Sequence, residues 1–187
     1  LGGLAGLTVA AMVLMRAVYD IVLIETVGVG QSETDIAGTA DTVVFCVQPG
    51  SGDSLQFMKA GIVEIPDIVV VTKADMGAAA ERARADVRGA LSLAEEARGG
   101  WEVPVLALSV QQRQGLGELI ATLDRHAAWL AGTGRLKGLR HAQARMWLAE
   151  AVRERFGREG IRRAGPLELG PEAAPFGELR AVARRLL

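Results

Sequence analysis

Cysteine is nearly absent from this sequence of 187 residues, since Cys46 is the only one. A single cysteine excludes an intramolecular disulfide framework and fits a reducing compartment, and its apolar neighbours predict a small buried side chain. Aromatic residues make up only 4% of the chain, and the formal net charge is −1. No strong overall field therefore draws the protein to nucleic acid or to anionic membranes.

Long hydrophobic runs are also missing. The apolar stretch Leu4–Met15 has about 12 residues, whereas a membrane span needs roughly 20. No basic segment precedes this stretch and no small-residue cleavage site follows it, so it does not predict a signal peptide. We interpret it as a buried helix and expect the 187 residues, which begin at Leu1 without a methionine, to be part of a longer chain.

Short apolar runs alternate with helical patterns, which predicts a parallel sheet covered by helices. Each predicted strand is apolar on both faces, as buried parallel strands are. The predicted strands are Asp20–Glu25, Asp41–Gln48, Asp67–Thr72 and Val103–Ser109. The predicted helices between them are Leu4–Tyr19, Ser54–Ile62, Gly77–Ala97 and Gly115–Ala131.

The character of the sequence changes near Gly134. Residues 136–156 predict a long amphipathic helix, 157–175 a loop and 176–187 a final helix. The apolar positions of the long helix are Leu139, Met146, Leu148, Val152 and Phe156. Its arginines predict a solvated face, because no aromatic stacking residues accompany them as a nucleic-acid site would require.

Polar residues follow the first predicted strand. Glu25 ends that strand, and Gly28 stands in the glycine-rich turn after it. In an open α/β sheet, ligands bind at the carboxyl ends of the strands, where a carboxylate can hold Mg²⁺ directly or through its waters. Gly28 would let a backbone N–H approach a terminal phosphate. An exposed acid followed by a simple turn explains the same residues equally well.

The third predicted strand ends in Thr72-Lys73-Ala74-Asp75, one residue away from the Asn-Lys-x-Asp signature of GTPases. Asp75 would accept hydrogen bonds from guanine N1–H and the 2-amino group, while the stem of Lys73 packs along the base. Adenine lacks both donors and would leave the carboxylate unpaired. The fourth predicted strand ends in Ser109-Val110, where a GTPase gives a backbone N–H to guanine O6.

Together these motifs resemble the MeaB/ArgK-type GTPases associated with adenosylcobalamin-dependent mutases. The run 25–33 is similar to the family's Walker B and second switch, and the run 49–61 is similar to its third switch. The resemblance covers residues 1–156 and implies a mostly parallel, P-loop NTPase-like α/β sheet flanked by helices, with a helical C-terminal extension.

The resemblance also implies roles for single residues. Glu25 would act on Mg²⁺ and Gly28 would touch the γ-phosphate, while Gln31 would orient a water or cap a helix. The third switch would contain Gly50, Asp53 and Lys59, with Asp53 and Lys59 completing the site; a turn Asp and a solvated Lys are the alternatives. Residues predicted to bind nucleotide are Gly28, Thr72, Lys73, Asp75, Ser109 and Val110.

Two departures from the family pattern stand out. Thr72 replaces an Asn, and a hydroxyl makes fewer hydrogen bonds than an amide. No Gly-x-x-x-x-Gly-Lys-Ser/Thr occurs, so the loop that cradles the α- and β-phosphates is not among these residues. We therefore expect this chain alone to be an inactive fragment without saturable GTP binding.

The resemblance implies a division into a partial G domain, 1–133, and a helical arm, 134–187, that forms a homodimer. The intact protein would hydrolyse GTP with Mg²⁺ and assist cobalamin delivery to, and protection of, a methylmalonyl-CoA-type mutase. It would work in the cytoplasm, or in the mitochondrial matrix of a eukaryote, without binding nucleic acid or membrane. A nickel-delivery GTPase and a non-catalytic interaction module are the alternatives; His126 and His141 are too few and too far apart in sequence to favour nickel.

Overall fold

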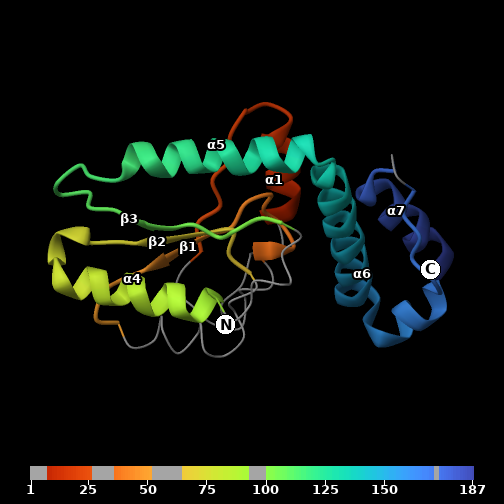
Figure 1. Cartoon of the computed structure of the whole chain (residues 1–187). Helices are drawn as coiled ribbons and strands as arrows, with labels where there is room; N and C mark the ends of the chain where they lie inside the picture. Colours follow the sequence, from red (N-terminus) through yellow and green to blue (C-terminus); the bar gives the residue numbers. More distant parts are fainter. Residues whose placement is uncertain (1–7, 27–35, 52–64, 93–99, 171–172) are drawn as a thin grey trace. The chain divides into compact units, whose positions relative to one another are not determined.

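The computed structural model describes residues 8–26, 36–51, 65–92, 100–170 and 173–187 (Figure 1). Its elements are α1 (Thr8–Arg16), β1 (Val44–Val47), β2 (Ile68–Val71), the 3-10 helix η2 (Ala74–Met76), α4 (Ala78–Leu91), β3 (Val105–Ala107), α5 (Leu116–Gly132), α6 (Arg135–Ala164) and α7 (Pro175–Leu186). These residues fall into two compact units, 23–132 and 6–22 with 133–187. None of the described helices is long and apolar enough to cross a membrane.

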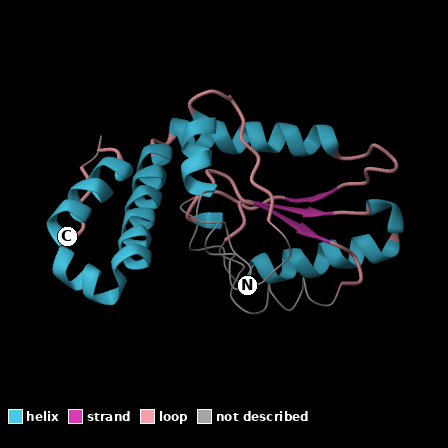
Figure 2. Ribbon diagram, turned by 180° about the vertical axis from the view of Figure 1, so that it is seen from behind, coloured by secondary structure: helices cyan, strands magenta, loops and turns pink. Residues whose placement is uncertain are grey.

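The first unit is built on a parallel sheet with the strand order β1-β2-β3 (Figure 2). Val71 lies opposite Val47 on one side and opposite Ala107 on the other. Because the three strands run in the same direction, their carboxyl ends meet at one edge of the sheet. That edge is where the predicted nucleotide-binding loops begin.

Helices cover both faces of this sheet (Figure 1). Val69 and Val71 pack on one face against α4, where Val87 is fully buried. Ile68 and Val70 face the other way, toward α5. All four residues of β2 are buried, as its continuous β-branched sequence predicts. The sheet and its helices confirm the predicted α/β class.

Residues 20–25 were predicted to form a strand, and this prediction is wrong. They are extended but belong to no strand, and Ile21 and Leu23 are 77% and 87% exposed. An extended segment becomes a strand only when its backbone pairs with a neighbour. Among the described residues β1 pairs with β2, and 20–25 have no such neighbour.

The other expectations differ mainly in length. α1 begins within the predicted helix and ends at Arg16, and it is not buried, since Met12 is its one buried residue and Leu14 is 72% exposed. α4 ends earlier than predicted, at Leu91. The predicted helix 54–62 lies outside the described residues. Cys46, predicted to be buried, is exposed on the edge strand β1, although its neighbours desolvate the thiol enough to raise its pKa.

The second unit contains α6 and α7, in the region where two C-terminal helices were predicted. The long helix was predicted to end at 156, and the backbone does break there, at Gly157 (φ 67°, ψ −169°). The chain then becomes helical again up to Ala164, where a loop was predicted. Leu148 and Val152 of α6 are fully buried against Val182 of α7. Met146, predicted to share their apolar stripe, is instead 58% exposed. The stripe is therefore mostly internal to this unit.

Candidate functional site

The loop after β2 is attached to both neighbouring strands. Thr72 donates two hydrogen bonds to the carbonyl of Val47, one from its backbone N–H (2.8 Å) and one from its hydroxyl (3.1 Å). Two residues later, the N–H of Ala74 donates to the carbonyl of Leu108 (3.0 Å). The predicted base-reading loop is therefore fixed to the ends of β1 and β3 by backbone acceptors. Thr72 supplies the brace to β1 with a hydroxyl in place of an amide.

The loop presents Lys73 and Asp75 to solvent. Lys73 has a left-handed backbone conformation (φ 51°, ψ 46°), which is uncommon outside glycine and reverses the chain directly after β2. Asp75 follows in the single turn of η2. Both side chains are exposed, so a ligand at the carboxyl edge of the sheet could reach them.

A direct hydrogen bond joins this loop to the loop after β3. The hydroxyl of Ser109 donates to Asp75 Oδ1 at 2.5 Å, and Ser109 is only 1% exposed. The same hydroxyl oxygen accepts the N–H of Gln112 (3.2 Å). Asp75 Oδ2 receives no hydrogen bond from the described residues, so this oxygen is available to an outside donor. The structure thus brings two separately predicted motifs into contact.

The turn after β3 is closed by its own backbone. Ser109 and Gln114 exchange two N–H to carbonyl hydrogen bonds, and Val110 between them is 82% exposed. Gly115 follows with φ +84°, where a Cβ atom would lie 2.2 Å from the carbonyl oxygen of Ala107. Only glycine fits there. Gly115 was not among the predicted site residues, although a glycine just before a helix is a usual signal for a tight turn.

The remaining predicted site residues are less defined. Glu25 lies at the end of the extended segment with an exposed carboxylate. Gly50 occupies a left-handed position (φ +79°) in the turn after β1, where Ser51 donates its N–H and hydroxyl to the carbonyl of Gln48. Gly28, Gln31, Asp53 and Lys59 lie outside the described residues.

The chemistry of Glu25 suits Mg²⁺, which prefers oxygen ligands such as carboxylates and water. In the described part of the chain, however, no group of three or more His, Cys, Asp or Glu side chains could hold a metal ion. Glu25 is thus a suitable single ligand and does not form a complete metal site by itself.

A second polar cluster lies at the amino ends of the strands, and sequence reasoning did not find it. His126 of α5 is 1% exposed; its Nδ1 pairs with the hydroxyl of Thr42 (2.8 Å), and its Nε2 lies 3.4 Å from Asp67 Oδ1. Asp67 Oδ2 accepts the N–H of Val43 (2.8 Å), and the carbonyl of Asp67 accepts the indole N–H of Trp101 (2.8 Å). We name Thr42, Asp67, Trp101 and His126 the amino-end cluster.

Burial lowers the pKa of His126, and the charge of Asp67 opposes this shift in part. The neutral imidazole is thus the favoured form in the folded protein. The Thr42 hydrogen bond fits this form, with the Thr42 O–H donating to Nδ1. Nε2 faces Asp67 Oδ1 at 3.4 Å and forms no hydrogen bond with any described residue. The ring stacks further on Trp129, at 5.6 Å between centroids.

The fold defines a P-loop NTPase-like α/β protein in which the loops after β2 and β3 meet at the carboxyl edge of the sheet. Comparison with known proteins narrows this class. Residues 1–162 match the family described as "Methylmalonyl Co-A mutase-associated GTPase MeaB". Because this match covers most of the chain, the chain belongs to the MeaB family.

Individual relatives agree with the family. A protein of Caulobacter vibrioides named "Putative GTPase" is 41% identical over 158 residues, which cover 83% of this chain and 48% of that protein. A protein of Mycobacterium tuberculosis named "Probable GTPase Rv1496" is 40% identical over 158 residues, which cover 82% of this chain and 47% of that protein. The mitochondrial methylmalonic aciduria type A homolog of Mus musculus is 36% identical, with coverages of 82% and 38%. The chain thus spans about half the length, or less, of these curated relatives.

Proposed function

We propose that the intact protein is a GTPase that works with a methylmalonyl-CoA-type mutase, and that these 187 residues contain its guanine-reading half. The observation that carries this proposal is the hydrogen bond from Ser109 to Asp75, which joins two GTPase motifs at the carboxyl edge of the sheet. Membership of a family of mutase-associated GTPases supports both the nucleotide and the partner.

Each residue of the loops has a distinct role in this proposal. Asp75 Oδ2 accepts from the donors of guanine while Ser109 holds Oδ1, and the stem of Lys73 covers a face of the base. The exposed N–H of Val110 meets guanine O6. Thr72 holds the loop to β1 through the carbonyl of Val47. A base that offers no donors to Asp75 would leave a carboxylate unsatisfied.

The phosphate side of the site rests on the family resemblance. Glu25 would hold Mg²⁺ directly or through water, Gly28 would contact the γ-phosphate, and Gln31 and Lys59 would act in hydrolysis. Gly50 and Asp53 would belong to the switch that responds to the mutase. Mg²⁺, when bound, would neutralise charge on the phosphates of GTP.

The sharpest test exchanges the base that the site accepts. In Asp75→Asn, the side-chain amide keeps an acceptor for N1–H but turns a donor toward position 2, where xanthine has an oxygen and guanine an amino group. We expect GDP affinity to fall by about 100-fold and XDP affinity to rise, because a buried donor facing a donor is strongly unfavourable. Competition binding on a protein that includes a phosphate-binding loop measures both. Unchanged discrimination between GDP and XDP would contradict the proposal.

The partner and the oligomer need separate measurements. We propose that the intact protein assists cobalamin delivery to the mutase and protects it, and that residues 134–187 form the arm of a homodimer beside a G domain that includes 1–133. Light scattering of the intact protein alone measures the homodimer, and light scattering with purified mutase measures the complex of the two proteins. Met146, exposed on α6, is the residue of the predicted stripe that is free to reach a second copy. Met146→Glu should weaken dimerisation without unfolding the α6–α7 core.

A further inference from the structure

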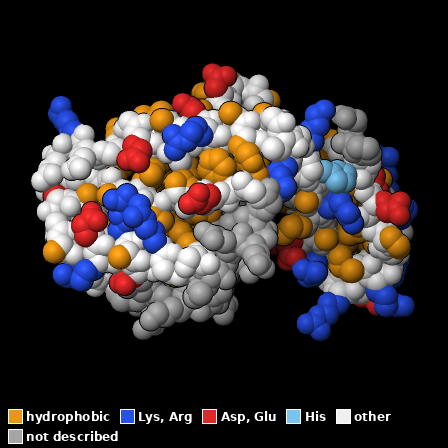
Figure 3. All heavy atoms as spheres, viewed as in Figure 1, with side chains coloured by type: hydrophobic (Ala, Val, Ile, Leu, Met, Phe, Trp, Pro, Cys, Tyr) orange, Lys and Arg blue, Asp and Glu red, His pale blue; other side chains and the backbone are white. Residues whose placement is uncertain are grey.

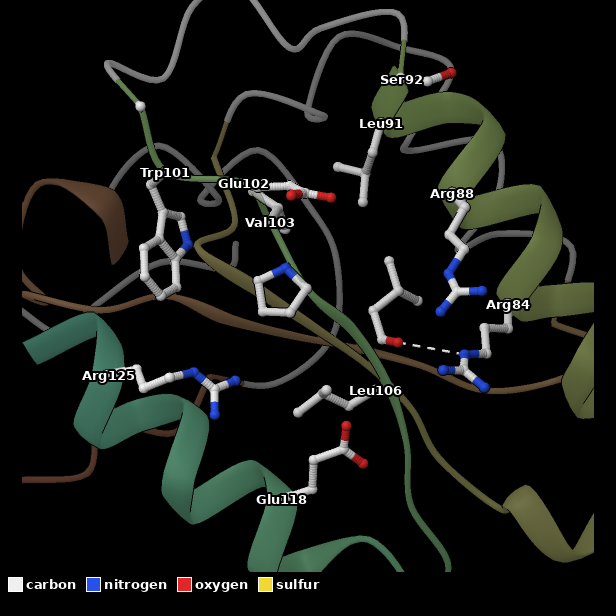
Figure 4. A pocket seen from close by; sticks show the side chains of 13 residues that line it. Arg84, Arg88, Leu91, Ser92, Trp101, Glu102, Val103, Leu106, Glu118 and Arg125 are labelled. Carbon is white, nitrogen blue, oxygen red and sulfur yellow. Dashed lines mark hydrogen bonds between the residues drawn. The ribbon is translucent and has the colours of Figure 1, made fainter. Parts of the chain in front are cut away.

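A groove opens along the outer edge of β3, between α4 and α5. It has a volume of about 670 Å³, within the size range of small-molecule sites. Its floor is the segment 100–106, and its walls come from the two helices (Figure 4). None of its lining residues belongs to the loops 72–75 or 109–114. We name it the arginine groove.

Three arginines reach this groove from opposite walls. Figure 4 shows Arg84 and Arg88 pointing inward from α4, and Arg125 from α5. Arg84 Nε donates to the carbonyl of Val105 (3.3 Å), and an NH2 of Arg125 donates to the hydroxyl of Thr122 (2.7 Å). Each of these two guanidinium groups is therefore oriented by one hydrogen bond and keeps further N–H donors for a ligand.

Two carboxylates limit what the groove can accept. Glu102 lies at one end and Glu118 on the α5 wall, so three arginines and two glutamates line the groove. Arg84 also forms an ion pair with Glu81 (4.0 Å). The guanidinium of Arg88 forms no ion pair or hydrogen bond with any described residue, and neither glutamate pairs with an arginine of the groove within the described part of the chain. Arg88 is therefore the arginine most open to a ligand. A polyanion would be repelled by the glutamates, whereas a compact acid could avoid them.

Apolar side chains lie among these charged groups. Figure 3 shows apolar side chains between α4 and α5, with basic and acidic side chains beside them. Trp101 forms one end of the groove, and its indole N–H is already bonded to the carbonyl of Asp67.

We propose that the arginine groove binds a small acid through carboxylate or phosphate groups that pair with Arg88 and Arg125. Each guanidinium presents a planar fork of N–H donors, which matches the oxygen pair of one such group. This site is separate from the guanine-reading loops and does not depend on the proposed function.

The test uses the indole N–H signals of the three tryptophans in the NMR spectrum of the whole chain. Inorganic phosphate and succinate are titrated separately, at constant ionic strength with chloride as the balancing salt. We expect a saturable shift of the Trp101 signal with at least one acid and none for Trp147, which lies in the other unit. The acid that binds more tightly distinguishes a phosphate ligand from a carboxylate ligand.

Matched substitutions assign the effect to the groove. Arg88→Ala and Arg125→Ala should each weaken binding by about tenfold, the usual effect of losing one charged hydrogen bond. Arg82→Ala, an exposed arginine of the same helix that does not line the groove, should leave binding unchanged. The ligand-free indole signals of Trp101 and Trp129, which lie in the same unit as the groove, show whether each variant is folded there. The proposal is overturned if neither acid gives a saturable shift, or if Arg82→Ala weakens binding as much as Arg88→Ala.

Discussion

Polar side chains at the two ends of the three-stranded sheet differ in how far they are exposed to solvent. At the carboxyl edge, Lys73 and Asp75 are exposed, and Asp75 Oδ2 is left without a partner among the described residues. At the amino edge, His126 is 1% exposed and pairs with Thr42 and Asp67. At both edges an acid accepts a hydrogen bond from a neighbouring segment. The side chain of Asp67 is 31% exposed, so the contrast between the edges lies in the buried His126.

Because of this difference, we expect the amino edge to stabilise the fold and the carboxyl edge to bind a ligand. A buried polar group is costly unless it is paired, and His126 Nε2 lies 3.4 Å from Asp67 Oδ1 without a hydrogen bond to any described residue. The amino-end cluster therefore contributes to stability through the hydrogen bonds that Thr42, Val43 and Trp101 make to His126 and Asp67. An exposed acid with one free oxygen contributes little to folding and can accept a hydrogen bond from a ligand. Substitution of a polar side chain at the amino edge should therefore mainly reduce stability, and substitution of a polar side chain at the carboxyl edge should mainly reduce binding.

The largest effect is expected at Gly115, which lies in close backbone contact with Ala107 beneath the carboxyl-edge turn. Gly115→Ala would place a Cβ atom against the carbonyl of Ala107 at a positive φ, so we expect a loss of about 4 kcal/mol or failure to fold. Urea unfolding measures it. Gly117→Ala is the control, because a Cβ there meets nothing within 4 Å and alanine favours the helix. Equal stability of the two variants would show that the turn tolerates the contact.

Removal of the buried imidazole should be nearly as severe. His126→Ala leaves a cavity and takes a partner from Thr42 and from Asp67, so we expect a loss of about 3 kcal/mol. The denaturation midpoint measures this loss. Ala substitution of His141, a half-buried histidine on α6 in the other unit, should cost under about 1 kcal/mol.

Acid should weaken the amino-end cluster. The folded-state pKa of His126 is lowered, so the unfolded chain binds the proton more readily. The contribution of His126 is therefore complete above about pH 6.5, the ordinary histidine value, and declines as pH falls toward the folded-state pKa. Unfolding free energies at several pH values should show this slope in the wild type and a smaller one in His126→Gln. The same slope in both proteins would assign the acid sensitivity to other groups.

The smallest effect on stability is expected at Asp75. Asp75→Asn should change the unfolding free energy by no more than about 0.5 kcal/mol, because the exposed side chain can still accept a hydrogen bond from Ser109. Thermal unfolding measures it beside Asp67→Asn, which alters the amino-end cluster and should cost about 1–2 kcal/mol. A larger loss for Asp75→Asn would reverse the comparison between the two edges.

Sequence reasoning found the carboxyl edge because its residues follow buried strands in order. Thr72, Asp75 and Ser109 stand directly after apolar runs, and the parallel topology then places them at one edge. The amino-end cluster has no such signal. Asp67 and His126 are 59 residues apart in sequence (126 − 67) and meet only because α5 packs back across the sheet. The segment 20–25 had the composition of a strand, but pairing depends on a neighbour that composition does not specify.

Base recognition by the carboxyl edge can be measured directly on these 187 residues, without any phosphate. Guanosine and adenosine are titrated separately while the backbone amide signals of the chain are recorded by NMR. The account predicts that guanosine shifts the signals of 72–75 and 109–110 weakly and without saturation, because no phosphate-binding loop is among these residues. Adenosine should not shift them, and Asp75→Asn should remove the response. Equal shifts with both nucleosides, or guanosine shifts confined to other residues, would contradict the claim that Asp75 and Ser109 form a guanine-reading site.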